Sequence, residues 1–416
     1  MAEAKQGMTD FNNNLPVMGQ CWGTLPSMRR KFDRYARRDF FRGHTREEFD
    51  AWQSGTRSLL HGLLGLDKME SCALSPVLED VVRLPGGIRR EHIRIQVEPD
   101  VWMPMFVLVP PGAGHFSRPF LCPPGHNGAG KYSVAGLYGY GPVREKIRQY
   151  HYDYGHQLAM LGYVAICPDC RGFGERREDL EDTKDLETAM KGDCRRLAHM
   201  GEPLGIPVAG MLAWDLMRAV DYLMERGEWD LDAISCLGFS GGGMQTLWLS
   251  AMDERVRLAV ISGYMYGYRD ALLALNRNCS CNYVPHLWEH LDMGDIASLI
   301  APRPLLIQSC SGDRLNGPRG IANVTEQVDI IRNAYRLLDA PGLMIHEICQ
   351  GPHQWHGENL AVHLGQLIDS YDQIKTNQHS GDMSRVFKKD FDIFFRKKGN
   401  FNRPSAENPK ANISSC

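Results

Sequence analysis

The chain has 416 residues, of which 43% are hydrophobic and 23% charged, and its formal net charge at pH 7 is −3. This composition is typical of a globular protein, and the length suits one large domain with an additional segment. The near-neutral charge excludes a strong basic field for nucleic acid and a polybasic patch for a membrane surface. We therefore expect a small neutral or mixed molecule as the partner.

The N-terminal stretch MAEAKQGMTDFNNN lacks the charged and apolar regions of a secretory signal. No run reaches the ~18 apolar residues of a membrane span. We therefore expect a cytoplasmic protein that has no membrane contact. In that compartment cysteine is reduced and behaves as a small buried hydrophobe. This interpretation suits five cysteines that lie in or beside apolar runs: Cys122, Cys167, Cys236, Cys310 and Cys349.

The first predicted elements are helical. Arg29 to Leu66 is rich in Arg, Phe and Leu, and Thr45 precedes the acidic pair Glu47 and Glu48, as an N-cap residue does. We therefore predict an N-terminal helical extension over residues 1–70. The following stretch, Val82 to Pro110, alternates apolar and polar residues and ends in prolines, which predicts antiparallel edge strands.

From residue 118 short apolar runs alternate with helical patterns. This alternation predicts a parallel sheet covered on both faces, an α/β doubly wound fold, over residues 71–374. The predicted strands are RPFLCPPG, YVAICPD, AISCLGFS, RLAVISG, RPLLIQSCSGD and LMIHEICQG, and the predicted helices include Val208 to Glu225, the segment after Ser240, Asn323 to Leu338 and a last one from Leu360.

Two segments do not follow this alternation of strands and helices. Residues 264–299 form a long connection between two strands, and we predict an inserted lid there because such long connections are usually functional. Residues 375–416 form a polar, basic tail, in which phenylalanines at 387, 391, 394 and 395 recur at helical spacing. The tail therefore predicts a short amphipathic helix that docks on its own domain or forms a contact in a homo-oligomer.

The most informative motif is LGFSGGGMQ, residues 237–245. The spacing Gly238-x-Ser240-x-Gly242 is that of a nucleophile elbow, in which a strand ends, the chain turns sharply and a helix begins behind an exposed hydroxyl. A serine hydroxyl is a weak nucleophile at neutral pH. It needs a base to accept its proton and a third group to orient that base.

The acid and the base are expected where later strands end. Asp313 directly follows the strand PLLIQSCSGD, and CQGPHQWHGE places His353 and His356 after the next strand. We favour His353, which is nearer the strand end, and keep His356 as the alternative base. The chain order Ser, Asp, His is that of α/β-hydrolases.

A tetrahedral intermediate also needs backbone N–H donors in an oxyanion hole. Gly241 follows the nucleophile and is expected to supply one donor. The loop CPPGHNGAGK, after the early strand, is expected to supply the other from His126 or Asn127. This loop is similar to the His-Gly type of oxyanion loop, although Pro124 stands where that pattern has its first histidine.

Several segments together resemble the acetyl xylan esterase and dienelactone-hydrolase-like branch of the α/β-hydrolase superfamily. The resemblance covers Leu63 to Ile374 and rests on GYVAICPDCRGFGERRE, GMLAWDLMRAVDYL, DLDAISCLGFSGGG, LIAPRPLLIQSCSGD and GPHQWHGE. It implies a serine esterase that uses a Ser240, Asp313 and His353 triad without a cofactor. It also implies acetyl or other short acyl esters as substrates, and we favour acetylated sugars or other small esters. A lactonase or a serine peptidase would use the same triad, and a non-catalytic binding protein with this fold is the alternative from another class.

Two further groups of residues suggest functional roles, and for each we prefer a simpler interpretation. We expect a local ion-pair lattice at Arg171, Glu175 and Arg176, because charged clusters usually have that role. HLWEH, residues 286–290, matches a zinc-protease pattern, and Cys279, Cys281, His286 and His290 have the chemistry of zinc ligands. A zinc protease needs a different fold. In the set of two cysteines and two histidines, the Cys-x-Cys spacing is tighter than is usual for zinc ligands, and Pro285 lies between the cysteines and the histidines. We therefore expect no metal.

Overall fold

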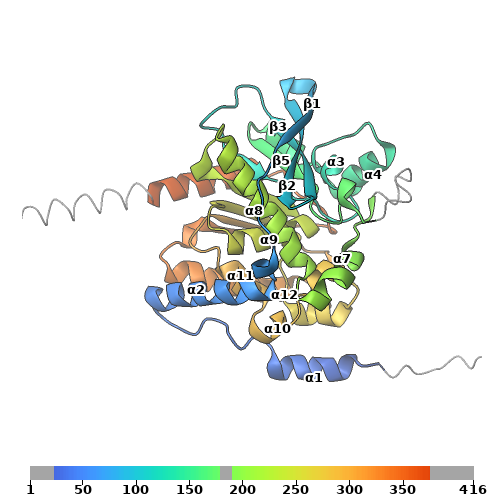
Figure 1. Ribbon diagram of the computed structural model, residues 1–416. Helices are drawn as coiled ribbons and strands as arrows, with labels where there is room; N and C mark the ends of the chain where they lie inside the picture. Colours follow the sequence, from blue (N-terminus) through green and yellow to red (C-terminus); the bar gives the residue numbers. More distant parts are fainter. Residues whose placement is uncertain (1–22, 179–189, 375–416) are drawn as a thin grey trace, which may run out of the picture.

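The computed structural model describes residues 23–178 and 190–374 (Figure 1). Its centre is a nine-stranded sheet with the order β1-β2-β3-β5-β4-β6-β7-β8-β9. The helix predicted around Phe387 to Phe395 lies outside the described residues, as does the whole N-terminal stretch MAEAKQGMTDFNNN. The division of the chain into an extension, a main domain and a tail stays a prediction.

One edge of the sheet is antiparallel, as the alternating pattern predicts. The strands are β1 (Val77–Arg83), β2 (Arg89–Glu98) and β3 (Val101–Val109), and β3 runs antiparallel to β5. In β2, buried residues alternate with more exposed ones, which gives the period of two that the sequence shows.

The other six strands are parallel, which confirms the predicted doubly wound sheet. Every residue of β4 to β8 is buried, so these strands appear in the sequence as continuous apolar runs. They are β4 (Pro119–Leu121), β5 (Val164–Pro168), β6 (Ser235–Phe239), β7 (Leu258–Ser262), β8 (Leu305–Cys310) and β9 (Met344–Cys349).

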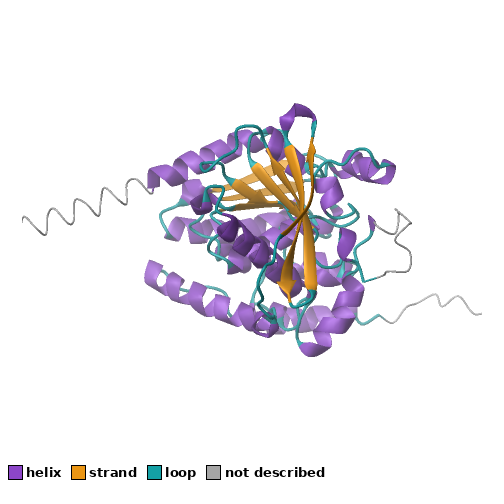
Figure 2. Cartoon of the chain, turned by 45° about the horizontal axis from the view of Figure 1, so that its top comes forward, coloured by secondary structure: helices purple, strands orange, loops and turns teal. Residues whose placement is uncertain are grey.

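Helices cover both faces of the sheet, as Figure 2 shows. The larger hydrophobic core joins one face to α2 (Arg46–Leu63), α8 (Val208–Arg226), α9 (Gly241–Met252), α11 (Met293–Ser298) and α12 (Ile321–Leu337). The smaller core joins the other face to α5 (Tyr154–Met160) and to the helix at 360–374. The shorter helices are α1 (Leu25–Tyr35), α3 (Lys131–Val134), α4 (Gly141–Tyr150), α7 (Cys194–Gly201) and α10 (Leu287–His290).

The predicted N-terminal helix is two helices. The chain breaks between α1 and α2, where Arg37 has a positive φ of 54° and its guanidinium binds Asp295 at 2.7 Å. Helix α2 begins as predicted, because the Thr45 hydroxyl accepts the Glu48 N–H and the Glu48 carboxylate accepts the Thr45 N–H. The helical stretch is therefore interrupted between α1 and the predicted cap at Thr45, where Arg37 contacts Asp295.

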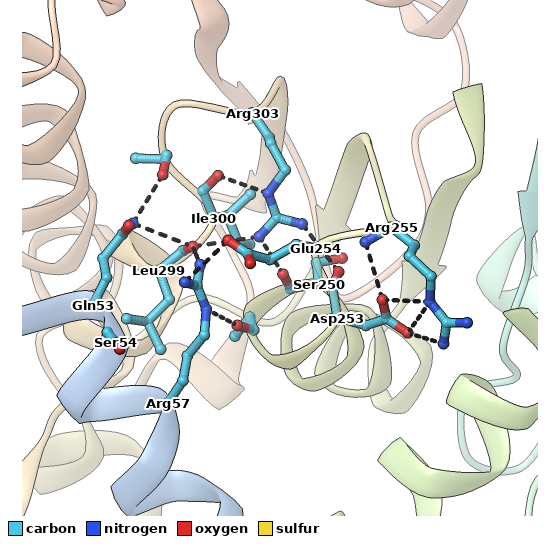
Figure 3. A network of polar contacts seen from close by, with 12 residues as sticks. Gln53, Ser54, Arg57, Ser250, Asp253, Glu254, Arg255, Leu299, Ile300 and Arg303 are labelled. Atoms are coloured by element: carbon cyan, nitrogen blue, oxygen red, sulfur yellow. Dashed lines mark hydrogen bonds and ion pairs between the residues drawn. The ribbon is translucent and has the colours of Figure 1, made fainter. Parts of the chain in front are cut away.

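Helix α2 and a buried arginine hold the C-terminal end of α9 (Figure 3). Arg303 is 7% exposed and donates to backbone carbonyls of Ser250, Asp253, Val256, Leu299 and Ile300. Arg57 of α2 donates to the Ala251 carbonyl at 3.1 Å and to the Leu299 carbonyl at 2.7 Å. These bonds satisfy carbonyl groups that the end of a helix leaves without intrahelical partners.

The ten described cysteines are all free. Among the described residues, no helix is long and apolar enough to cross a membrane.

Replacing Arg303 with methionine is expected to lower the free energy of unfolding by about 3 kcal/mol, because several buried carbonyl groups lose their donor. Urea denaturation followed by tryptophan fluorescence measures the change. Arg332→Met is the control, because Arg332 is 37% exposed and pairs with nearby Asp329 at the surface, and its effect is expected to stay within about 0.5 kcal/mol. Equal losses in the two variants would contradict the role given to Arg303.

Candidate active site

Ser240 lies in a strained turn between β6 and α9. Its φ of 58° and ψ of −121° are unusual for a residue with a side chain. A Cβ atom at Gly238 would lie 2.3 Å from the Gly242 carbonyl group, and one at Gly242 would lie 2.3 Å from the Pro123 carbonyl oxygen. Both flanking positions therefore need glycine, and the predicted strand, turn and helix context is confirmed.

The structure brings Ser240, His353 and Asp313 together. His353, after β9, has Nε2 at 2.8 Å from the Ser240 Oγ and Nδ1 at 2.5 Å from an Asp313 carboxylate oxygen. Asp313, after β8, is 4% exposed and also accepts the Leu315 N–H at 2.8 Å. With Nδ1–H donating to Asp313, Nε2 of His353 is left as an acceptor for the serine proton.

His356 lies elsewhere. Its Nδ1 is 3.6 Å from a Glu358 carboxylate oxygen, and its backbone carbonyl accepts a hydrogen bond from Gln308. Its side chain is not among those that line the cavity at Ser240. The geometry therefore favours His353 over His356.

A cavity of about 940 Å³ opens above Ser240, and Gly241, His126 and Asn127 are among its lining residues. A Cβ atom at Gly241 would lie 2.6 Å from Nδ1 and 3.4 Å from the backbone N of His126, so the two backbones approach closely there. Tyr152, whose pKa burial raises, donates its hydroxyl hydrogen to the His126 carbonyl at 2.6 Å. Gly241 and His126 are thus close neighbours, and Asn127 lines the same cavity as Ser240. Their role in an oxyanion hole stays a prediction.

A buried ion pair fixes the loop that carries His126 and Asn127. Lys131 and Asp169 are both 0% exposed, and the Lys131 N–H and ammonium each bind the Asp169 carboxylate at 2.6 Å. A Cβ atom at Gly130 would lie 2.0 Å from that carboxylate, so the loop leaves no space between its backbone and the acid. The ammonium also pairs with Glu175.

The charged motif around Arg171 forms the expected ion-pair lattice. Arg171 and Arg176 bind the fully buried Asp215 at 3.1 and 2.6 Å. Burial alone would raise the pKa of Asp215, but the two guanidinium groups hold that pKa below its usual value. Asp215 is therefore a buried anion that anchors the loop after β5.

The predicted inserted segment, 264–299, forms one wall of the cavity. It contributes Tyr264, Tyr266, Arg277, Asn278 and Asn282 to the lining. Much of the segment is packed in the larger core, including both tyrosines. Its role as a lid stays a prediction.

Sequence reasoning missed a cluster of side chains at the edge of this cavity. His126 Nε2 and the sulfur atoms of Cys194, Cys279 and Cys281 all lie within 4.8 Å of one another. The histidines considered as partners of these cysteines point elsewhere: His286 pairs with Glu289, and His290 pairs with Asp39. The four residues come from three segments that are distant in the sequence, so no local spacing predicts the cluster.

Comparisons with known proteins agree with this fold. A model of the Abhydrolase family matches residues 21–398. A candidate hydrolase, YtaP, from Bacillus subtilis is 28% identical over 181 residues, which are 43% of this chain and 56% of that protein. The match thus spans little more than half the length of this curated relative.

Solved structures share the fold at low sequence identity. A candidate acetyl xylan esterase from Bacteroides fragilis is 20% identical with a TM-score of 0.66, over 81% of this chain and 84% of that one. A glucuronoyl esterase from Solibacter usitatus is 15% identical with a TM-score of 0.56, over 77% of this chain and 93% of that one.

Replacing Asp169 with asparagine is expected to lower the free energy of unfolding by about 3–5 kcal/mol, because the Lys131 ammonium is left without its fully buried partner. Urea denaturation measures the loss. Asp329→Asn is the control, because that carboxylate is 58% exposed and pairs with Arg332 at the surface. A loss at Asp169 no larger than that of the control would show that the pair does not fix the loop.

Proposed function

Because the chain belongs to the Abhydrolase family, we propose that it is a serine carboxylic-ester hydrolase with a Ser240, His353 and Asp313 triad. The observation that carries the proposal is the contact between the Ser240 Oγ and His353 Nε2 at 2.8 Å, at a strained turn that faces a cavity. Esterases among the structures of the same fold support this reaction class.

In this mechanism Ser240 attacks the ester carbonyl carbon while His353 Nε2 accepts its proton. Asp313 holds the imidazole in the required tautomer and stabilises its charged form. His353 then gives the proton to the leaving alcohol as the bond between carbonyl carbon and alkoxy oxygen breaks. Water attacks the resulting acyl-enzyme with His353 again as the base, releasing the acid and restoring Ser240.

The negative charge of the tetrahedral intermediate is stabilised by backbone N–H groups. The Gly241 N–H lies at the beginning of α9, and the second donor comes from His126 or Asn127. The close approach between Gly241 and His126 supports this assignment, because it places the backbone of His126 next to the residue that follows Ser240. The buried pair of Lys131 and Asp169 keeps the second loop in position.

For the substrate we propose acetylated sugars or other small short-acyl esters. The cavity of about 940 Å³ has room for a sugar unit, and its lining combines tyrosines with asparagine and arginine side chains. Such a surface suits a polar ring with hydroxyl groups. The names of the structural neighbours, an acetyl xylan esterase and a glucuronoyl esterase, point to carbohydrate esters as well.

Labelling with a fluorophosphonate tests the nucleophile. Wild type is expected to react and Ser240→Ala is not, because the probe needs an activated serine. On p-nitrophenyl acetate, kcat is expected to fall about 10⁴-fold or more for Ser240→Ala and for His353→Ala. His356→Ala is the matched control and is expected to keep activity near that of wild type.

Three results would contradict parts of this proposal. A wild-type protein that takes up no probe would be a hydrolase-like binding protein. Equal activity of His353→Ala and wild type would reject His353 as the base. Faster turnover of lactones or peptides than of any ester would assign the same triad to another acyl transfer.

A series of p-nitrophenyl esters and acetylated saccharides tests the substrate class. We expect kcat/KM to be highest for acetyl and to fall as the acyl chain lengthens, with acetylated saccharides turned over faster than simple alkyl acetates. A preference for long acyl chains would contradict the proposed substrate.

A further inference from the structure

Four potential metal ligands meet beside the proposed oxyanion loop. His126 comes from the loop after β4, Cys194 from the first residue of α7, and Cys279 and Cys281 from the segment between β7 and β8. Cys194 and Cys281 are buried, and Cys279 is half-buried. None of the three thiols takes part in the ester hydrolysis proposed above.

The spacing of the four atoms suits a tetrahedral site. With zinc bonds of about 2.3 Å to sulfur and about 2.05 Å to nitrogen, tetrahedral angles separate a nitrogen ligand from a sulfur ligand by about 3.6 Å. His126 Nε2 is 3.4 Å from the Cys281 sulfur and 3.7 Å from the Cys194 sulfur. All four ligand atoms lie within 4.8 Å of one another.

We propose that His126, Cys194, Cys279 and Cys281 bind one structural zinc ion. Three thiolates and one imidazole are a ligand set that zinc favours, whereas magnesium and calcium require oxygen ligands. Four protein ligands fill a tetrahedral coordination sphere and leave no position for water or substrate. The ion therefore holds structure and takes no part in the chemistry at Ser240.

The surroundings of the cluster support a metal site more than a disulfide. The Asn282 side-chain amide donates toward the Cys281 sulfur at 3.7 Å, and the Tyr264 hydroxyl donates to the Asn282 side-chain oxygen at 2.8 Å. Hydrogen bonds of this kind orient thiolate ligands from outside the coordination sphere. A disulfide would use two of the sulfur atoms and leave His126 and the third thiol without a shared role.

The site would tie together three segments that are far apart in the sequence. One is the loop of His126, which approaches Gly241 so closely that a Cβ atom there would lie 2.6 Å from the imidazole Nδ1. Another is the segment that carries Cys279 and Cys281 and forms a wall of the cavity. Zinc would thus fix the position of the oxyanion loop against the nucleophile.

Metal analysis of the full-length protein, purified without metal-affinity chromatography or chelators, tests the site directly. We expect about one zinc per chain by elemental mass spectrometry. After zinc is exchanged for cobalt, we expect the visible d–d and thiolate charge-transfer bands of a tetrahedral site. Neither readout depends on ester hydrolysis, so the proposal stands or falls separately from the proposed function.

Substitutions locate the ligands. Cys194→Ser and Cys281→Ser each remove a proposed ligand. Loss of an outer hydrogen-bond partner already weakens metal binding about 10–100-fold, and we expect each of these two variants to weaken zinc binding by more than that. Cys349→Ser is the matched control, because this half-buried thiol in β9 lies outside the cluster, and it is expected to keep full zinc content. If a cysteine variant fails to fold by circular dichroism, the cobalt spectrum of wild type decides.

Two outcomes would overturn the proposal. One is a wild-type protein that contains no zinc and takes up neither zinc nor cobalt. The other is a wild type in which peptide mapping under non-reducing conditions shows that two of the three cluster cysteines are joined in a disulfide. Equal zinc content in Cys194→Ser and wild type would remove Cys194 from the site.

Discussion

The site depends on the close backbone approach at the Ser240 turn. A residue held at such dihedral angles costs roughly 1–3 kcal/mol, and it persists only where its surroundings determine it. Here Gly238 and Gly242 leave room for the turn, and the chain at Pro123 closes over it. A larger side chain at either glycine would separate β6, α9 and the oxyanion loop from one another.

Helix α9 is fixed at both ends, which explains how the strained turn is kept. Its N-terminal end packs against Pro123 and His126, and the Gln245 side chain donates to the Pro124 carbonyl at 2.8 Å. Its C-terminal end is held by Arg303 and Arg57. The N-terminal helix α2, which contributes no residue to the lining of the cavity, thereby supports the helix that follows the nucleophile. Buried ion pairs likewise hold the neighbouring loops in position. Asp169 binds the oxyanion loop through Lys131, and Asp215 anchors the loop after β5.

Much of the fold and of the site follows from local sequence signals. The parallel strands β4 to β8 were predictable because both their faces are buried, and the positions of Ser240 and Asp313 were predictable because each comes shortly after such a strand. The choice between His353 and His356 was open, because both occupy one loop and only three-dimensional packing separates them. The beginning of α2 at Thr45 was predictable from its cap, but the end of α1 at Tyr35 was missed, because the chain beyond it turns where Arg37 contacts the distant Asp295.

The cluster of His126, Cys194, Cys279 and Cys281 could not be predicted from the sequence. Cys279 and Cys281 were considered with the nearest histidines in the sequence, whereas the fold brings them to His126 and Cys194. Closeness in the sequence does not indicate the partners of these cysteines, because the four residues meet only when the inserted segment packs against α7 and the loop after β4.

The central claim is that Ser240 carries the acyl group during ester hydrolysis. Mass spectrometry of peptides from protein quenched during turnover of p-nitrophenyl acetate tests it most directly. The account predicts the mass of one acetyl group on the peptide that contains Ser240, and none on that peptide in Ser240→Ala. An acetyl group found on a cysteine or another serine, or active wild-type protein that never carries one, would contradict it.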